Sequence, residues 1–306
     1  MSMTEPKTIL VPTDFSEAAE AALDVALELA AQVRAKVHLM HAIQPPYVGF
    51  SDGLEFPTAD LATRIQAKGA ADLAASLAKR SGTTVDLASI LVEGDPRETV
   101  LEAAEEVDAD LVIMGTHGRR GLRRALMGSV AESVVRECAR PVMTVHGPRA
   151  VAGPFRHILV PTDFTDTSRR ALDVALELAR ASGASITLLH IWSLPMMGYG
   201  ESLMWPREAL ERAAQEALDD LLATTKKIHV KTDALLRQGS EATVIIEAVT
   251  SARCDLVVLG THGRLGLARL LLGSVAGEVI RRCATPVLTV GNPSASDGER
   301  RALRQA

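Results

Sequence analysis

The sequence predicts an α/β protein built from two tandem domains, each an open sheet of five parallel strands with four helices. Two observations carry this prediction. Short apolar runs alternate with helical patterns along the chain, as they do when helices wrap a parallel sheet. The same order of runs also occurs twice, because Ile-Leu-Val-Pro-Thr-Asp-Phe at 9–15 returns at 158–164 and residues 22–30 return unchanged at 171–179. A repeat of this length indicates two copies of one domain.

The elements of the first copy follow one another in a regular order. The strand Thr8–Pro12 precedes a helix in which Leu23, Ala26, Leu27 and Ala30 form a stripe at i, i+3, i+4 and i+7. The remaining elements are a strand at 37–42, a helix at about 58–80, a strand at 84–92, a helix opened by the cap and first-turn proline of Asp95-Pro96-Arg97-Glu98, a strand at 111–114, a helix at 129–138 and a strand at 141–145.

Changes in composition suggest where the domains begin and end. We expect domain 1 at 1–146, a linker rich in Gly and Pro at 147–155, domain 2 at 156–290 and a flexible polar tail at 291–306. The segments 44–60 and 192–206 hold most of the aromatic residues. These segments could close over a bound base, cover the edge of their own core or contact another subunit.

Composition also excludes several classes of protein. The 306 residues are 47% hydrophobic and only 3% aromatic, which suits two aliphatic cores. A net charge of -5 gives no general attraction for nucleic acid. Three cysteines without a Cys-x-x-Cys pair indicate a reducing compartment, and no apolar run reaches the length of about 20 residues that spans a membrane. We therefore expect a cytoplasmic protein with neither nucleic acid nor membrane as partner.

A glycine signature stands out in both copies. Gly115-Thr116-His117-Gly118 is followed after nine residues by Gly128-Ser129, directly after one predicted strand and before one predicted helix. The second copy repeats the pattern with Gly260-Thr261-His262-Gly263 and Gly273-Ser274. Backbone amides at a helix N-terminus, left accessible by glycine, form a site for a phosphate group. We expect the amides of Gly115, Gly118, Gly128 and Ser129 to donate to phosphate oxygens.

An aspartate follows the first strand of each copy. Ligands of open parallel sheets bind beyond the carboxyl ends of the strands. Asp14 and Asp163 would therefore each face the glycines of their own copy across a crevice. A carboxylate repels phosphate and would instead accept hydrogen bonds from ribose hydroxyls. Two structural alternatives stay open: each aspartate could cap the following helix, and Ser129 could form a capping box with Glu132. Gly115 and Gly260 could also merely end a strand.

Histidines and arginines near these motifs allow two interpretations each. His117 and His262 either contact phosphate or are simply exposed, whereas His41 and His190 are expected to satisfy a hydrogen bond inside the fold. No ligand spacing supports a metal site. The arginines shared by the two copies are candidate anion contacts, and two more in the first copy predict a more basic and tighter first site: the shared pairs are Arg119/Arg264 and Arg124/Arg269, and the extra residues are Arg120 and Arg123.

These residues resemble the universal stress protein family, in its ATP-binding branch and its tandem type. The resemblance runs from Lys7 to Val290 and is most specific in Gly-x-x-Gly-x9-Gly-Ser and in Val-Pro-Thr-Asp at 11–14 and 160–163. It implies Rossmann-like sheets of strand order 3-2-1-4-5, ATP with or without Mg²⁺ as ligand, and a homodimer of the tandem chain. The implied nucleotide-binding residues are Pro12, Thr13, Asp14, Ala42, Met114, Gly115, His117, Gly118, Arg119, Gly128, Ser129 and Val130 in the first copy, and Pro161, Thr162, Asp163, Ile191, Leu259, Gly260, His262, Gly263, Arg264, Gly273, Ser274 and Val275 in the second.

Two functions compete at this stage. The first is a regulatory ATP-binding protein of the stress response, with one site per repeat and no catalytic residues. The second is a slow ATPase or phosphotransfer enzyme. The chain lacks Gly-x4-Gly-Lys-Ser/Thr, so no lysine follows either Gly-Ser to reach the terminal phosphates, which favours the first function. A flavodoxin-like carrier would need a Ser/Thr-rich loop after the first strand, where this chain has Pro12-Thr13-Asp14-Phe15.

Overall fold

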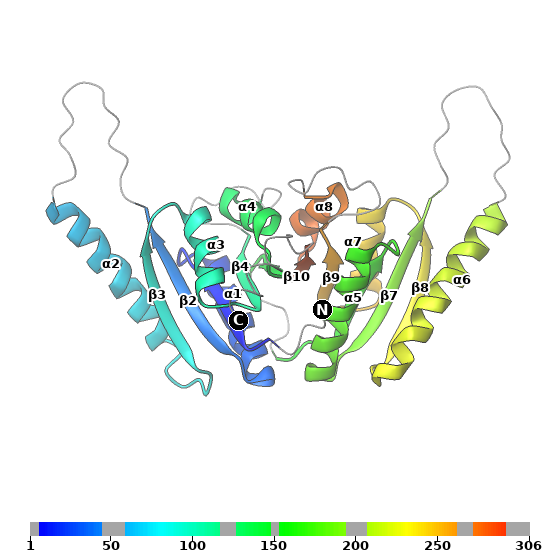
Figure 1. Cartoon of the computed structure of the whole chain (residues 1–306), viewed down its shortest axis with the longest axis horizontal. Helices are drawn as coiled ribbons and strands as arrows, with labels where there is room; N and C mark the ends of the chain where they lie inside the picture. The colour runs from blue at the N-terminus through cyan, green and yellow to red at the C-terminus, as the bar shows by residue number, and fades with distance from the viewer. Residues whose placement is uncertain are drawn as a thin grey trace, which may run out of the picture. The chain divides into compact units, whose positions relative to one another are not determined.

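The computed structural model describes residues 6–44, 59–116, 127–147, 153–193, 207–261 and 272–291 (Figure 1). The chain divides into two compact units, which we call the first unit (Pro6–Gly153) and the second unit (Pro154–Asn292). The first unit contains β1 (Thr8–Pro12), α1 (Glu17–Val33), β2 (Lys36–Ile43), α2 (Ala59–Ala78), β3 (Leu87–Glu93), α3 (Pro96–Glu106), β4 (Leu111–Gly115), α4 (Ser129–Glu137) and β5 (Val142–Val145).

The second unit repeats this order. It contains β6 (His157–Thr162), α5 (Asp166–Ser182), β7 (Ser185–Trp192), α6 (Arg207–Thr225), the 3-10 turn η1 (Lys226–Ile228), β8 (Thr232–Gln238), α7 (Glu241–Ser251), β9 (Leu256–Gly260), α8 (Ser274–Arg282) and β10 (Val287–Val290).

Each unit holds a parallel sheet of five strands. The order in the first unit is β3-β2-β1-β4-β5, and in the second unit it is β8-β7-β6-β9-β10. The fold class and the strand order expected from the sequence are therefore confirmed. The right-handed connection rule places α1 and α2 on one face of the first sheet and α3 and α4 on the other. Contacts between α3 and α4, and between α7 and α8, agree with this arrangement.

The central strands are apolar on both faces because helices cover both sides. Ile9, Leu10 and Val11 on β1 are fully buried, as are Ile158, Leu159 and Val160 on β6. The stripe expected on α1 also faces the core, where Leu23, Ala26 and Ala30 are buried and Leu27 is half-buried. Because all strand pairs are parallel, the carboxyl ends of the strands lie at one edge of each sheet.

Local signals set most of the element ends. The α3 N-cap is Asp95, whose side chain accepts the Arg97 N–H at 2.9 Å, and Pro96 occupies the first helical position, as expected. β3 begins at Leu87 rather than at the expected Thr84. The Thr83 hydroxyl accepts the Val85 N–H at 3.2 Å, and this local turn delays the start of the strand. None of the helices in the described ranges is long and apolar enough to cross a membrane.

Candidate nucleotide site

The candidate site of the first unit lies where the strand order reverses. β1 pairs with β2 on one side and with β4 on the other. The chain continues from β1 to β2 and β3 on the first side and then crosses to β4 on the second side. The carboxyl ends of β1 and β4 meet at this point. The turn at Pro12–Asp14 and the strand end at Gly115 therefore lie at one edge of the sheet, as the sequence predicted.

The turn after β1 is held by side chains that bond back to the backbone. The Thr13 hydroxyl accepts the Phe15 N–H at 2.9 Å, and the Asp14 carboxylate accepts the Ser16 N–H at 3.0 Å. Ser16, rather than Asp14, is the N-cap of α1 and accepts the Ala19 N–H at 3.3 Å. Asp14 therefore shapes the turn without capping the helix, and the capping alternative does not describe it.

Phe15 has a left-handed backbone, with φ at +62°. For a bulky residue this conformation costs about 1–2 kcal/mol, so the surrounding contacts must impose it. The Phe15 ring lies 4.5 Å from the His41 ring, centroid to centroid. His41 Nδ1 lies 2.8 Å from the Thr13 carbonyl oxygen, within hydrogen-bond distance. The internal hydrogen bond expected for His41 is therefore confirmed, and it ties the end of β2 to the turn.

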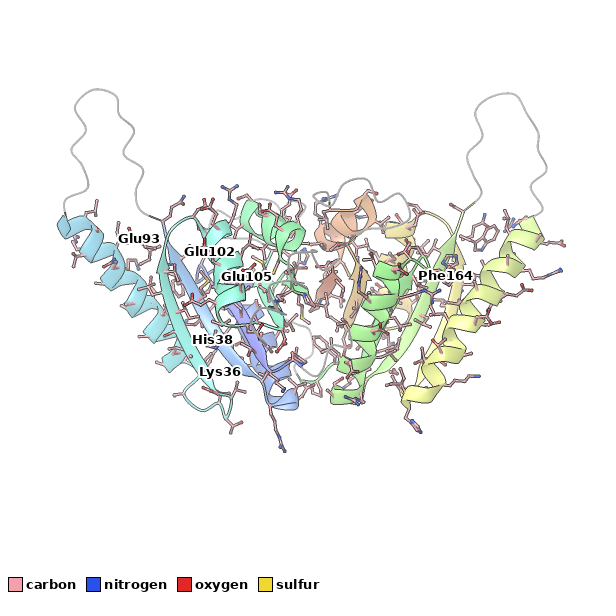
Figure 2. The ribbon with its side chains drawn as sticks, in the orientation of Figure 1. Lys36, His38, Glu93, Glu102, Glu105 and Phe164 are labelled. Carbon is pink, nitrogen blue, oxygen red and sulfur yellow. The ribbon has the colours of Figure 1, made fainter. Side chains whose placement is uncertain are left out.

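The second unit repeats this turn. Phe164 has φ at +64°, its ring lies 4.4 Å from the His190 ring, and His190 Nδ1 lies 2.7 Å from the Thr162 carbonyl oxygen. The Asp163 carboxylate accepts both the N–H (3.1 Å) and the hydroxyl (2.6 Å) of Thr165, the N-cap of α5. Figure 2 labels Phe164 among the side chains of the second unit. The internal hydrogen bond expected for His190 is confirmed as well.

Burial and hydrogen bonding act on the Asp163 carboxyl in opposite directions. Burial would raise the pKa of this group, but the hydrogen bonds from the Thr165 hydroxyl and backbone hold the pKa below its usual value. The carboxylate is therefore charged at neutral pH. A charged carboxylate on a half-buried turn accepts strong hydrogen bonds from hydroxyl groups.

Close packing explains why glycine ends β4 and β9. A Cβ on Gly115 would lie 2.8 Å from the backbone of Ala18 and Ala19, at the start of α1. A Cβ on Gly260 would lie 2.8 Å from the Thr167 methyl group, at the start of α5. These glycines therefore do more than end a strand, because each lets the first turn of a helix approach the sheet edge that carries the aspartate turn.

The N-terminus of α4 lies beside the carboxyl end of β4, and its free amides differ from those that the sequence predicted. The Gly128 N–H donates to the Thr116 carbonyl at 2.8 Å, and the Gly273 N–H donates to the Thr261 carbonyl at 2.8 Å. The expectation that the Gly128 amide donates to phosphate is therefore wrong, because this donor is already used. Glycine also gives room at this position, because a Cβ on Gly128 would lie 3.2 Å from the Thr116 oxygen and would push the two segments slightly apart.

The first turn of α4 is left without a side-chain cap. Gly128 is the N-cap and makes no side-chain hydrogen bond, and Ser129 is the first helical residue. The capping box between Ser129 and Glu132 does not form, since it would need Ser129 at the cap position. α8 begins in the same way, with Gly273 as N-cap and Ser274 exposed. The first-turn amides of both helices, including those of Ser129, Val130, Ser274 and Val275, have no helical acceptor and are available to an anion.

Other predicted residues divide into two groups. Met114 and Leu259 are buried, at 4% exposure each, and Ala42 and Ile191 are half-buried at the ends of β2 and β7. Within the described ranges no three His, Cys, Asp or Glu side chains gather as a metal site. The remaining predicted residues lie outside the described residues: His117, Gly118, Arg119, Arg120, Arg123, Arg124, His262, Gly263, Arg264 and Arg269.

Sequence reasoning missed the part played by Phe15 and Phe164. Their signal was present, because a phenylalanine follows the aspartate and a histidine ends the second strand in both copies. Only the structure shows that each phenylalanine ring contacts the histidine ring of its own unit and that this contact holds the left-handed turn.

Comparisons with known proteins agree with this fold. A model of the universal stress protein family matches residues 5–146 and 154–291. A universal stress protein of Mycolicibacterium smegmatis is 30% identical over 92% of this chain and 96% of its own length, and one of Mycobacterium tuberculosis is 32% identical over 65% and 67%. The crystal structure of a universal stress protein from Archaeoglobus fulgidus shares the fold, with a TM-score of 0.72, 19% identity and coverage of 95% and 98% of the two chains.

Proposed function

The chain belongs to the universal stress protein family, and we propose that each of its units binds one adenine nucleotide, ATP with or without Mg²⁺, as a regulatory signal. One observation carries this proposal. In each unit a fixed aspartate turn and an uncapped helix N-terminus lie at the two sides of the point where the strand order reverses. A nucleotide needs both kinds of group, because its ribose donates hydrogen bonds and its phosphates accept them.

Charge decides the orientation of the nucleotide. The Asp14 and Asp163 carboxylates repel phosphate and accept the ribose hydroxyls. The positive end of the helix dipole and the free amides attract phosphate to α4 and α8. Adenine then extends toward Ala42 and Ile191 at the ends of β2 and β7, where main-chain groups can bind its edge. This arrangement supports the resemblance noted in the sequence.

The proposed output is a change of conformation or of partner contact, without catalysis. The chain carries no lysine directly after Gly128-Ser129 or Gly273-Ser274 to stabilise charge on a transferred phosphoryl group. We expect any ATP turnover to stay below about 1 per second, the low end of ordinary enzyme rates. Phosphate release at tens per second from the purified chain would instead favour the ATPase. We also propose that the chain acts in the cytoplasm as a homodimer. Analytical ultracentrifugation of the purified chain tests the dimer.

The test uses charge removal without loss of the turn. Asp14→Asn keeps an oxygen that accepts the Ser16 N–H but removes the charge, and Asp163→Asn does the same in the second unit. We expect each variant to weaken ATP binding at its own site about tenfold, since a hydrogen bond to a charged group is stronger by about 1–1.5 kcal/mol than one to a neutral group. Calorimetry on the full chain measures both sites.

A matched control lies at the opposite edge of the first sheet. Asp86 precedes β3, its side chain is 71% exposed, and it pairs with Lys36 at 3.8 Å. Asp86→Asn should leave ATP affinity unchanged. Mass spectrometry of the ligand released from the purified chain identifies the nucleotide. Unchanged affinity in the chain with both Asp14→Asn and Asp163→Asn would overturn the site.

A further inference from the structure

The outer strand of the first sheet has a free edge. Of the strands that the structure describes in the first unit, only β2 pairs with β3, so the other side of β3 presents unpaired N–H and C=O groups. α2 packs against β2 and β3, whereas α3 packs against β1 and β2 on the opposite face of the sheet (Figure 1). A free edge of this kind can be extended by one more strand.

The side chains of β3 are mostly apolar and alternate between the two faces of the sheet. Leu91 lies on the face that α2 covers, and 38% of its side chain stays exposed. The strand has one charged residue, Glu93, at its last position. The face opposite α2 is uncharged and half-buried along the strand, where it carries Ala88, Ile90 and Val92.

The flank of α2 beside this strand is uncharged as well. Residues spaced by three or four share one side of a helix, and most of this flank lines an open groove together with Leu91. The amide of Gln66 donates to the Glu93 carboxylate at 3.3 Å, so the charge at the end of β3 has a partner. The flank consists of five exposed residues: Thr63, Gln66, Ala67, Ala70 and Ala74. We call β3 and this flank the outer edge of the first unit.

The matching edge of the second unit is charged. The strand register equates Ala88 with Asp233 and Val92 with Arg237, and both charged side chains are exposed. The matching flank of α6 is also exposed and holds Glu208, Glu211, Arg212, Gln215 and Asp219. Charged side chains protect a strand edge from further pairing and are depleted from the centres of protein interfaces. The outer edge of the first unit is therefore the better suited of the two to burial in an interface.

We propose that this outer edge forms the interface of the homodimer, in which β3 pairs antiparallel with β3 of a second copy of the chain. The inference rests on the homodimer proposed above and assigns its surface. A two-fold axis joins identical surfaces, and about such an axis a strand pairs with its own copy in the antiparallel direction. A register centred on Ile90 uses all seven residues of β3 and places Ala88 opposite Val92 of the second copy.

A second copy fits this edge because each group meets a compatible one. The apolar stripe of β3 meets an identical stripe. The two Glu93 carboxylates stay at opposite ends of the paired strands, about 20 Å apart at roughly 3.4 Å per residue, so they do not repel each other strongly. The same axis brings the two α2 flanks side by side, and the alanines at 67, 70 and 74 let the helices approach to about 8–10 Å.

The experiment compares two lysines at equivalent positions by sedimentation equilibrium of the full chain. Ala88→Lys places a charge in the proposed interface and should weaken dimerisation at least about tenfold. Its matched control, Asp233→Lys, places the same side chain on β8 and should leave the dimer unchanged. Both variants should bind ATP as the parent chain does, because the substitutions lie outside the proposed nucleotide sites.

A third variant tests the register. Val92→Glu alone should also weaken dimerisation. Mixed with Ala88→Lys, it should form a heterodimer about 2–5-fold tighter than the homodimer of either variant, because the new lysine of one chain faces the new glutamate of the other. A mixture that dimerises no better than its components contradicts the register centred on Ile90.

The outcomes separate this interface from the homodimer itself. A parent chain that stays monomeric contradicts both proposals and leaves the edge of β3 to a strand of another protein. If the parent dimerises and Ala88→Lys dimerises equally well, or if Asp233→Lys weakens the dimer as much, the homodimer stands but its interface lies elsewhere. Hydrogen exchange of the parent decides if Ala88→Lys fails to fold. The amides of β3 should exchange more slowly at dimer concentrations than at monomer concentrations, and unchanged exchange overturns the proposal.

Discussion

The helix that follows the first strand is anchored differently in the two units. In the first unit Arg80, in the turn after α2, donates to the carboxylates of Glu20 at 2.8 Å and Asp24 at 2.7 Å on α1. In the second unit the positions of Glu20 and Arg80 are taken by Arg169 and Thr225, which cannot form this network. The turn before each helix nevertheless has the same backbone, with φ near +60° at the phenylalanine. The turn is therefore set by its local hydrogen bonds and the histidine contact, not by the anchoring of the helix.

The largest difference between the units should come from their strand-ending glycines. In Gly115→Ala the new methyl group would meet backbone atoms of Ala18 and Ala19 at 2.8 Å, and backbone cannot rotate away. In Gly260→Ala it would meet mainly the Thr167 methyl group. We expect Gly115→Ala to lower the free energy of unfolding by about 3 kcal/mol and Gly260→Ala by about 1 kcal/mol. Urea denaturation followed by circular dichroism measures both.

A second substitution tests the cause. Thr167→Ser removes the methyl group that blocks a side chain at 260 and should restore most of the stability lost in Gly260→Ala. No side-chain truncation offers the same relief for Gly115→Ala. If the two glycine variants lost equal free energy of unfolding, α1 would shift as easily as Thr167 rotates. The proposed difference between the two units would then be wrong.

The next effect concerns the Arg80 anchor, which only the first unit has. Arg80→Met keeps much of the apolar stem but leaves Glu20 and Ser76 without their charged donor. Because the Glu20 side chain is 23% exposed and the Arg80 side chain 12%, water compensates in part, and we expect a loss of about 1–2 kcal/mol in unfolding free energy. Arg169→Met, at the position of Glu20 on the exposed side of α5, should change it by less than about 0.5 kcal/mol.

The same anchor has a defined pH dependence. Burial would raise the pKa of Glu20, but the hydrogen bond and charge of Arg80 outweigh it and hold the pKa below the usual 4.5. A lowered folded pKa gives stability that is present above the unfolded value and is lost as the pH falls through the folded value. The parent chain should therefore lose this contribution below about pH 4.5, and Arg80→Met should lose less there. Urea titrations across this pH range measure the free energy of unfolding. If it decreased equally in the parent chain and in Arg80→Met, the pH dependence would not come from the pair of Glu20 and Arg80.

Repetition in the sequence was enough to predict the sheets, because buried strands must be apolar and the two copies agree on where such runs lie. β1 was placed correctly at both ends for this reason. Contacts between distant residues could not be predicted in the same way. The spacing of the glycines indicated a phosphate loop, yet Gly115 meets α1 and Gly128 donates to Thr116. The spacing of glycines does not show whether a glycine makes room for a neighbouring backbone or exposes an amide to an anion. The positions of the neighbouring backbone atoms distinguish these two roles.

The aspartate turn lies between these two cases, the predicted sheets and the unpredicted contacts. Its position at a strand end was predicted, whereas the left-handed Phe15 was not, because sterics disfavour that conformation unless the His41 contact and the Thr13 hydroxyl impose it.

The smallest expected effect tests which nucleotide site is tighter. Arg120 and Arg123 favour the first site, but Glu132 lies in the first turn of α4, where α8 has Gly277 and no acidic residue. A negative charge at a helix N-terminus opposes a bound phosphate by about 0.3–1 kcal/mol. Glu132→Gln should therefore strengthen ATP binding at the first site about 2–5-fold, measured by calorimetry in a chain whose second site carries Asp163→Asn.

The reverse change belongs in the second unit. Gly277→Glu, in a chain that carries Asp14→Asn, should weaken the second site by a smaller factor, because Arg281 lies within 3.2 Å of the new Cβ and would screen the carboxylate. The two variants move the sites in opposite directions only if phosphate sits at the helix N-termini. If ATP affinity changes in neither, the phosphates are bound elsewhere, and the arginines that follow Gly118 and Gly263 become the remaining source of anion affinity.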